Sequence, residues 1–238
     1  MSTCAGLSRI ARRAAVFGAL LAPPLLAADR PAVLPDSMEQ RLLACTSCHA
    51  RKDSSDRLFP RIAGKPAGYL YNQLLNFREG RRSYPLMTYM VDHLPDTYLR
   101  EIADYFSGQH LPAPASRPAD VSAATLERGR LLATEGDAAI KVPACMACHG
   151  QQLTGVAPAI PGLLGLPRDY VNAQFGAWKN KVRHAHAPDC MAAIAERLGL
   201  DDVAAVSAWL ASQPLPPDPR PATAVARPLP LQCGSSPD

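Results

Sequence analysis

The sequence predicts an all-α protein made of two similar, small helical domains in tandem. Three observations carry this prediction. The pattern Cys-x-x-Cys-His occurs twice, at Cys45–His49 and Cys145–His149, one hundred residues apart. Helix-spaced apolar positions repeat between the two halves of the chain. The alternation of apolar and polar residues that marks a half-buried strand is essentially absent.

Each Cys-x-x-Cys-His motif predicts the covalent attachment of one haem c. Two thiols three residues apart can add to the two vinyl groups of one porphyrin, and the adjoining histidine then lies beneath the iron as proximal ligand. We therefore expect two haems, one held by Cys45, Cys48 and His49 and the other by Cys145, Cys148 and His149. Isolated zinc or redox CxxC sites are the alternative. A zinc ribbon needs two such pairs close together, and a thioredoxin-like site needs a βαβ pattern that is not visible here.

The first 28 residues have the features of an export signal. Three arginines within residues 9–13 form a basic start, residues 14–22 are apolar or small, and Ala28 precedes the expected cleavage point. An uncleaved anchor is the alternative, although the apolar run is shorter than the roughly 20 residues that span a bilayer. Removing residues 1–28 takes away three arginines and no acidic residue, so the net charge falls from +4 to +1. That charge leaves no electrostatic footprint for nucleic acid, and we expect protein partners.

Composition divides the remaining chain. We expect residues 29–111 to form the N-terminal domain and residues 120–213 the C-terminal domain. Residues 112–119 are proline-rich and predict an extended linker, and helical periodicity resumes at Ala124. Residues 214–238 are again proline-rich and predict a tail without regular structure.

The helices of the two halves repeat. A helix that follows a proline turn has one apolar face in each half, at an offset of 101: Tyr69, Leu70, Gln73, Leu74 and Phe77 correspond to Tyr170, Val171, Gln174, Phe175 and Trp178. The last helix repeats at an offset of 104: Leu99, Ile102, Tyr105 and Phe106 correspond to Val203, Val206, Trp209 and Leu210. We expect three main helices per domain, wrapped on a porphyrin that supplies much of the apolar surface such a small domain lacks.

A methionine sulfur is the expected sixth ligand of each iron, because it favours the reduced metal and raises the potential. Met191 is the only methionine that follows Cys148. Met87 is expected at the first haem, because Met87 and Met191 each lie seven residues before the leucine that introduces the last helix. Met90 is the alternative, with a role as a flexible gap filler if Met87 is the ligand.

Other ligands compete for the same positions. A bis-histidine haem would draw on His93, His184 or His186. A thiolate from Cys190 would change the chemistry of the iron altogether. In an exported protein, however, two spare cysteines tend to pair. We expect a disulfide between Cys190 and Cys233, with two unrelated free thiols as the alternative.

Proximal histidines need their second ring nitrogen anchored, commonly by donation to a backbone carbonyl. Pro60 and Pro161 lie in turns about a dozen residues after their histidines, and the fixed φ of proline would hold the carbonyl direction steady. We expect these two residues to support His49 and His149. Chain breaking before the next helix is the alternative role.

Taken together, these motifs resemble the dihaem cytochrome c4 family of class I c-type cytochromes. The similar features are two CxxCH domains, each with a Pro-x-Ile/Leu-x-Gly turn before a Tyr-x3-Gln helix, then a methionine and a last helix with an aromatic residue near its end. The resemblance covers residues 37–212. It implies a periplasmic protein, soluble or peripherally bound to the membrane, with two His/Met haems related by pseudo-twofold symmetry. It also implies electron exchange with respiratory oxidases or dehydrogenases.

Two departures from the family pattern lie in the first half. Ala50 replaces the usual glycine after the first motif, and the expected first helix, Met38–Ala44, lacks the glycine that Gly129 provides in the second half. A close crossing of the first and last helices is therefore expected only in the second domain.

The resulting hypothesis is a periplasmic electron carrier rather than an enzyme, because His and Met ligands leave no open position on the iron. Its partners would be redox proteins, met through small, transient interfaces. The runner-up is a dihaem redox enzyme acting on thiosulfate or peroxide, with a labile or Cys-ligated haem. A third possibility is the cytochrome subunit of a dehydrogenase complex, with the tail as a docking strap.

Overall fold

The computed structural model describes residues 35–49, 59–110, 116 and 118–236. Residues Asp36–Asp238 form one compact unit, and all described helices and strands lie within it. The expected signal, residues 1–28, lies outside the described residues, as do Ala50 and most of the expected linker 112–119. No helix among the described residues is long and apolar enough to cross a membrane.

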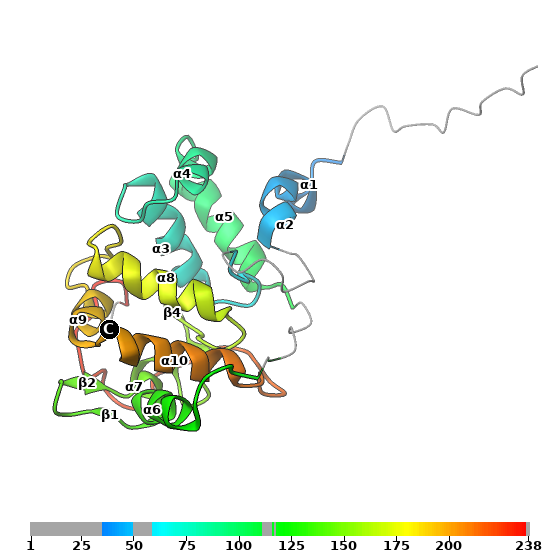
Figure 1. Cartoon of the computed structure of the whole chain (residues 1–238). Helices are drawn as coiled ribbons and strands as arrows, with labels where there is room; N and C mark the ends of the chain where they lie inside the picture. Colours follow the sequence, from blue (N-terminus) through cyan, green and yellow to red (C-terminus); the bar gives the residue numbers. More distant parts are fainter. Residues whose placement is uncertain (1–34, 50–58, 111–115, 117, 237–238) are drawn as a thin grey trace, which may run out of the picture. The chain divides into compact units, whose positions relative to one another are not determined.

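The described residues of the first half form five helices (Figure 1). They are α1 (Met38–Arg41), α2 (Leu43–His49), α3 (Ala67–Arg78), α4 (Pro85–Val91) and α5 (Asp96–Ser107). The helix predicted over Met38–Ala44 begins at Met38, where Ser37 caps it, but is interrupted at Leu42. A second helix then carries the first motif. The expected methionine also lies in a helix, α4, so the half contains more than the three helices predicted.

The second half repeats this order with additions. Its helices are α6 (Ala123–Thr134), α7 (Cys145–His149), α8 (Arg168–Lys179), α9 (Cys190–Arg197) and α10 (Leu200–Ser212). Two antiparallel pairs of two-residue strands flank the motif helix: β1 (Gly136–Asp137) with β2 (Val142–Pro143), and β3 (Gly155–Val156) with β4 (Ile160–Pro161). The sequence did not predict these strands, because two residues are too few to show alternation. The all-α class is confirmed despite them.

Each half has its own apolar core. In the first half the core joins α3 and α5 around Leu70, Leu75, Leu99 and Phe106. In the second half it joins α6, α8 and α10 around residues that include Leu132, Val206 and Leu210. The repeated last-helix positions are buried in both halves, apart from the partly buried Tyr105 and Trp209.

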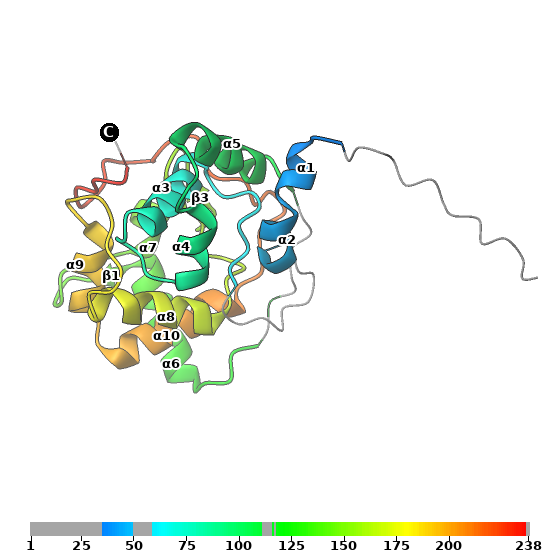
Figure 2. The same cartoon turned by 90° about the horizontal axis from the view of Figure 1, so that it is seen from above.

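Gly129 sets the closest helix crossing of the second half. In both views α10 lies between α8 and α6 (Figures 1 and 2). A Cβ at Gly129 would lie 2.2 Å from the carbonyl oxygen of Ala205 and 2.8 Å from the Cβ of Trp209. Real Cβ atoms do not approach backbone this closely, so only glycine permits α6 to cross α10 at this distance. The close crossing predicted from Gly129 is confirmed.

The tail after α10 contains no helix or strand among its described residues, 213–236, as predicted. It nevertheless makes specific contacts. The backbone N–H of Ala222 donates to Gly155 O at 2.9 Å, and Ala222 O accepts from Ala157 N at 2.8 Å. Farther on, a disulfide joins Cys233 to Cys190, the first residue of α9. The predicted pairing of these two cysteines is therefore present, and it fixes the tail beside α9.

Candidate functional site

A cavity of about 710 Å³ is lined by residues of both halves, including all the cysteines and histidines of the two motifs. Its volume lies within the range of small-molecule and cofactor pockets. Most of its wall is apolar, and residues of the two cores such as Leu70, Phe77, Val171 and Phe175 contribute to it. An apolar wall of this kind suits the faces of a porphyrin.

The motif side chains reach the cavity because each motif is helical. In α2 and α7 the two cysteines and the histidine occupy positions i, i+3 and i+4, which share one face of a helix. The four cysteines are free thiols. Burial raises the pKa of Cys145 to about 12 and also raises the pKa of Cys45 and Cys148. At neutral pH these three thiols are therefore protonated.

Both histidines are anchored through one ring nitrogen. His49 Nδ1 lies 2.9 Å from Pro60 O, and His149 Nδ1 lies 2.7 Å from Pro161 O. Because a carbonyl can only accept, the proton is on Nδ1 and the Nε2 lone pair is left free. Burial lowers the pKa of both rings, which keeps them neutral. The expected contacts of Pro60 and Pro161 are present, and they leave each imidazole in the tautomer that can ligate iron.

Three methionines line the cavity, and they come from α4 and α9. Met191, from α9, lines the cavity, and so do Met87 and Met90, both from α4. The structure thus brings the expected sulfur ligands to the same cavity as the histidines. It brings Met90 there too, so the choice of Met87 stays a prediction.

The rival ligands differ in their contacts, although His184, His186 and Cys190 line the same cavity as the methionines. The side chain of His93 is 91% exposed. His184 Nε2 lies 2.8 Å from Lys181 O, and His186 Nε2 lies 3.2 Å from Arg81 Nη2. Cys190 is held in its disulfide, so its sulfur is not a free thiolate.

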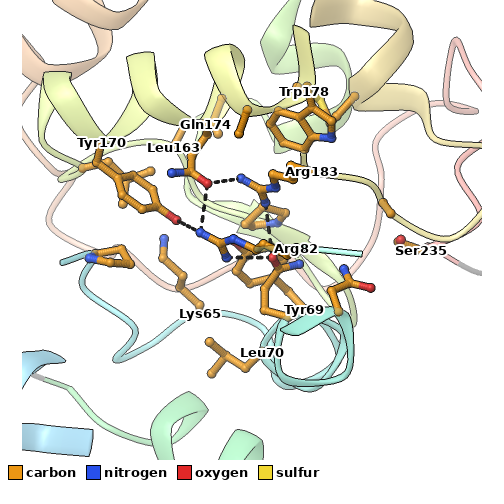
Figure 3. Close-up of a pocket in the computed structure, with 18 of the residues that line it drawn as sticks. Lys65, Tyr69, Leu70, Arg82, Leu163, Tyr170, Gln174, Trp178, Arg183 and Ser235 are labelled. Carbon is orange, nitrogen blue, oxygen red and sulfur yellow. Dashed lines mark hydrogen bonds between the residues drawn. The ribbon is translucent and has the colours of Figure 1, made fainter. Parts of the chain in front are cut away.

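A polar cluster that obeys the internal repeat joins the two halves (Figure 3). Arg82 and Arg183 are related by the offset of 101, as are the glutamines and tyrosines around them. Arg82 donates to Gln73 Oε1 at 2.9 Å in its own half, and to Gln174 Oε1 at 2.9 Å and Tyr170 Oη at 3.0 Å in the other. Arg183 donates to Gln174 and, at 3.2 Å, to Gln73. Each half therefore holds the other through charge-assisted hydrogen bonds.

The two guanidinium groups also stack on equivalent aromatic rings. Arg82 lies 4.6 Å from the centroid of Phe77, and Arg183 lies 3.9 Å from that of Trp178. Arg183 is only 6% exposed. Among the described residues no carboxylate forms an ion pair with either guanidinium, although buried charges are normally paired.

The two guanidinium groups of the cluster therefore lack an anionic partner among the described residues. Arg82, Arg183 and Lys65 line the cavity, whereas Asp189 is the one acidic residue among its described lining, and it caps α9. The Nε1 of Trp178 is buried without a hydrogen-bond partner among the described residues. Cationic groups and an unused N–H donor in an apolar cavity fit a ligand with an apolar body and carboxylate groups. A haem, with its two propionates, has this composition, so the residues present fit the predicted cofactor.

The sequence analysis placed Tyr69, Gln73, Tyr170 and Gln174 on one face of the repeated helix, and it missed Arg183. The same offset that aligned the helices also aligns Arg82 with Arg183, so the signal was available in the repeat. Lys65 was missed for a different reason. Its partner, Gly162 O, lies 97 residues away in the other half, and local sequence carries no signal for that contact.

Comparison with curated proteins finds relatives over most of the chain, although no family model matches. A thiosulfate dehydrogenase electron acceptor of Thiomonas intermedia is 34% identical over 177 residues, which cover 73% of this chain and 80% of the relative. Cytochrome c4 of Pseudomonas aeruginosa is 30% identical over 175 residues, which cover 72% of this chain and 85% of the relative.

A solved structure is also similar. Thiosulfate dehydrogenase (TsdBA) from Marichromatium purpuratum, in its as-isolated form, matches with a TM-score of 0.64 and 34% sequence identity. The match covers 72% of this chain but only 36% of that one, so this chain spans about a third of the length of that dehydrogenase.

Proposed function

We propose, because this chain belongs to the cytochrome c4 family, that it carries single electrons between redox proteins through two covalently attached haems c. The observation that supports this most directly is the cavity itself. It is lined by two copies of the same set of residues, two thiols and an anchored neutral histidine, together with methionines from α4 and α9. A repeated set of this kind matches one porphyrin per motif.

In the first site, Cys45 and Cys48 would form the thioether links, with His49 and Met87 as the axial ligands. In the second site the same roles fall to Cys145, Cys148, His149 and Met191. The iron, when bound, supplies one-electron oxidation and reduction. The chain's own contribution is to fix the proximal rings through Pro60 O and Pro161 O, and to surround the sites with apolar side chains that exclude water.

The arginine cluster would receive the propionates of both haems. All partners of Arg82 and Arg183 among the described residues are neutral. The carboxylates of the cofactor would therefore supply the missing negative charge. Because each arginine bonds glutamines of both halves, the same contacts would hold the two domains, proposed as residues 29–111 and 120–213, in a fixed relation. We also propose that residues 112–119 connect the two domains and that the tail, residues 214–238, acts as a strap.

A carrier is favoured over an enzyme by the state of Cys190. The enzymatic alternative needs an iron with an open or thiolate-ligated position, and Cys190, the cysteine that pointed there, is bonded to Cys233. The names of the relatives suggest the electron donor. Because one relative is a thiosulfate dehydrogenase electron acceptor, we propose an enzyme of that kind as the donor. With the export signal expected in residues 1–28, this exchange would take place in the periplasm.

A stable cytochrome subunit is the second candidate, and one comparison favours it. The similar region of the Marichromatium protein belongs to a longer chain that is itself a thiosulfate dehydrogenase. The same module could therefore act as a permanently bound part of a dehydrogenase. A subunit would copurify with the enzyme at low concentration, whereas a carrier would separate from it.

The test uses the haem-loaded protein, thiosulfate and a purified thiosulfate dehydrogenase. We expect the Soret and α-band changes of haem reduction only when enzyme and thiosulfate are both present. Reduction by thiosulfate alone, with turnover, would show that this chain is the enzyme. Failure to accept electrons from the dehydrogenase, in a protein that a small reductant reduces fully, would refute the proposed donor.

A further inference from the structure

One cation in the cavity wall breaks the internal repeat. Lys65 belongs to the first half, but its Nζ donates to Gly162 O in the second half at 3.0 Å. The residue that corresponds to Lys65 at the offset of 101 is Leu166, which also lines the cavity but carries no charge. The contact therefore exists at one of the two sites only.

The contact is made beside the proximal ligand of the second site. Gly162 directly follows Pro161, whose carbonyl accepts the hydrogen bond from His149 Nδ1 at 2.7 Å. Gly162 is itself tightly packed, because a Cβ there would lie 2.5 Å from Thr154 O. The ammonium of Lys65 thus bonds a rigid segment one residue away from the group that holds His149.

Lys65 has little to neutralise it. Its hydrogen bond goes to a neutral carbonyl, and no carboxylate among the described residues forms an ion pair with it. Burial and the neighbouring charge of Arg61 lower the pKa of Lys65 to about 8, so the ammonium is still mostly charged at pH 6 to 7. A positive charge in a cavity wall of low polarity acts over a longer range than one in water.

Resting on the proposed function, we propose that Lys65 is a tuning residue for the second haem: its fixed positive charge, held against the Pro161–Gly162 segment, raises the reduction potential of the His149 site and leaves the His49 site largely unaffected. The physical reason is that ferric haem carries one more positive charge than ferrous haem, so a nearby cation disfavours the oxidised state. The two haems, attached by motifs of the same CxxCH pattern, would then differ in potential through one residue supplied by the opposite half.

The test is a spectroelectrochemical titration of the haem-loaded protein at pH 6, with three substitutions at this position. Lys65→Met removes the charge and the donor, Lys65→Gln removes the charge and keeps a donor, and Lys65→Arg keeps both. We expect Lys65→Met and Lys65→Gln to lower one of the two midpoint potentials. A tenfold fall in the equilibrium constant for reduction of that haem corresponds to roughly 59 mV for a one-electron couple. The other potential should stay in place, and Arg should restore the wild-type value.

The outcomes separate the inference from its basis. Unchanged potentials in all three variants, or an equal shift of both haems, would overturn the role of Lys65 while leaving the electron-carrier proposal intact. If the potential shifts in Lys65→Met but stays at the wild-type value in Lys65→Gln, the hydrogen bond matters and the charge does not. That result would also overturn the role of Lys65. Absence of any haem-centred redox transition in the wild-type protein would instead refute the proposed function.

Discussion

The crossing of α6 and α10 gives the sharpest test of the packing that positions the second site. The perturbation is Gly129→Ala, which adds one methyl group at the closest point of the crossing. In the structure that carbon would lie 2.2 Å from Ala205 O and 2.7 Å from Ala205 C, both backbone atoms that cannot rotate away. The two helices must therefore move apart, and the core around Leu132 and Val206 must open with them.

The magnitude follows from two opposing terms. Overpacking of this kind costs about 1–3 kcal/mol, and contact with backbone places it at the upper end. Alanine gains about 1 kcal/mol over glycine in helix propensity. The net loss is then about 2 kcal/mol, which lowers the unfolding temperature of a chain of this size by about 4–8 °C.

Gly176 in α8 is the matched control. A Cβ at Gly176 meets nothing within 4 Å, so Gly176→Ala keeps only the favourable propensity term of about 1 kcal/mol. We expect its unfolding temperature to rise by about 2–4 °C. Thermal unfolding of both haem-loaded variants, followed by far-ultraviolet circular dichroism, measures the difference. A change in unfolding temperature of the same sign in both variants would contradict the steric role of Gly129.

Three further predictions concern the tail, the iron ligands and the arginine cluster. Serine at both Cys190 and Cys233 opens a loop closed across 43 residues, which removes about 4 kcal/mol of chain-entropy stabilisation; limited proteolysis should then cleave the tail, and unchanged cleavage would contradict the tether. Met191→Ala should let carbon monoxide bind one ferrous haem, whereas Met90→Ala should bind no more carbon monoxide than the wild type. Equal carbon monoxide binding by the two variants would contradict the assignment of Met87, rather than Met90, to the first haem. Arg183→Met loses charge-assisted hydrogen bonds worth about 1.5–3 kcal/mol each, so the guanidinium chloride midpoint should fall, and an unaltered midpoint would exclude a stabilising role.

Much of this fold is local in origin and was therefore visible in the sequence. The face at Tyr69 and its counterpart at Tyr170 follow helical spacing, and the last-helix positions such as Leu99 and Val203 are buried as predicted. The six motif residues line one cavity because a helix places i, i+3 and i+4 together. The two proline carbonyls lie beside the histidines as expected, and Met87, Met90 and Met191 all line the cavity.

The remaining features depend on contacts between distant segments. The hydrogen bond from Lys65 to Gly162 joins residues 97 positions apart, and that from Asn72 Nδ2 to Ser235 O joins residues 163 apart. No local pattern specifies which loop of one half meets which loop of the other. Arg183 is an intermediate case, since its position in the repeat was readable but its burial was not. The two-residue strands are too short to show an alternating pattern in the sequence.

Intact-mass spectrometry of the purified, secreted protein tests the central proposal most directly. We predict a mass equal to the processed polypeptide plus two haems, retained under denaturing conditions because each porphyrin is bound through two thioethers. Substituting Cys145 and Cys148 together should reduce the increment to one haem. A wild-type mass equal to that of the polypeptide alone, or with haem that dissociates on denaturation, would contradict covalent attachment and with it the proposed electron-carrier function.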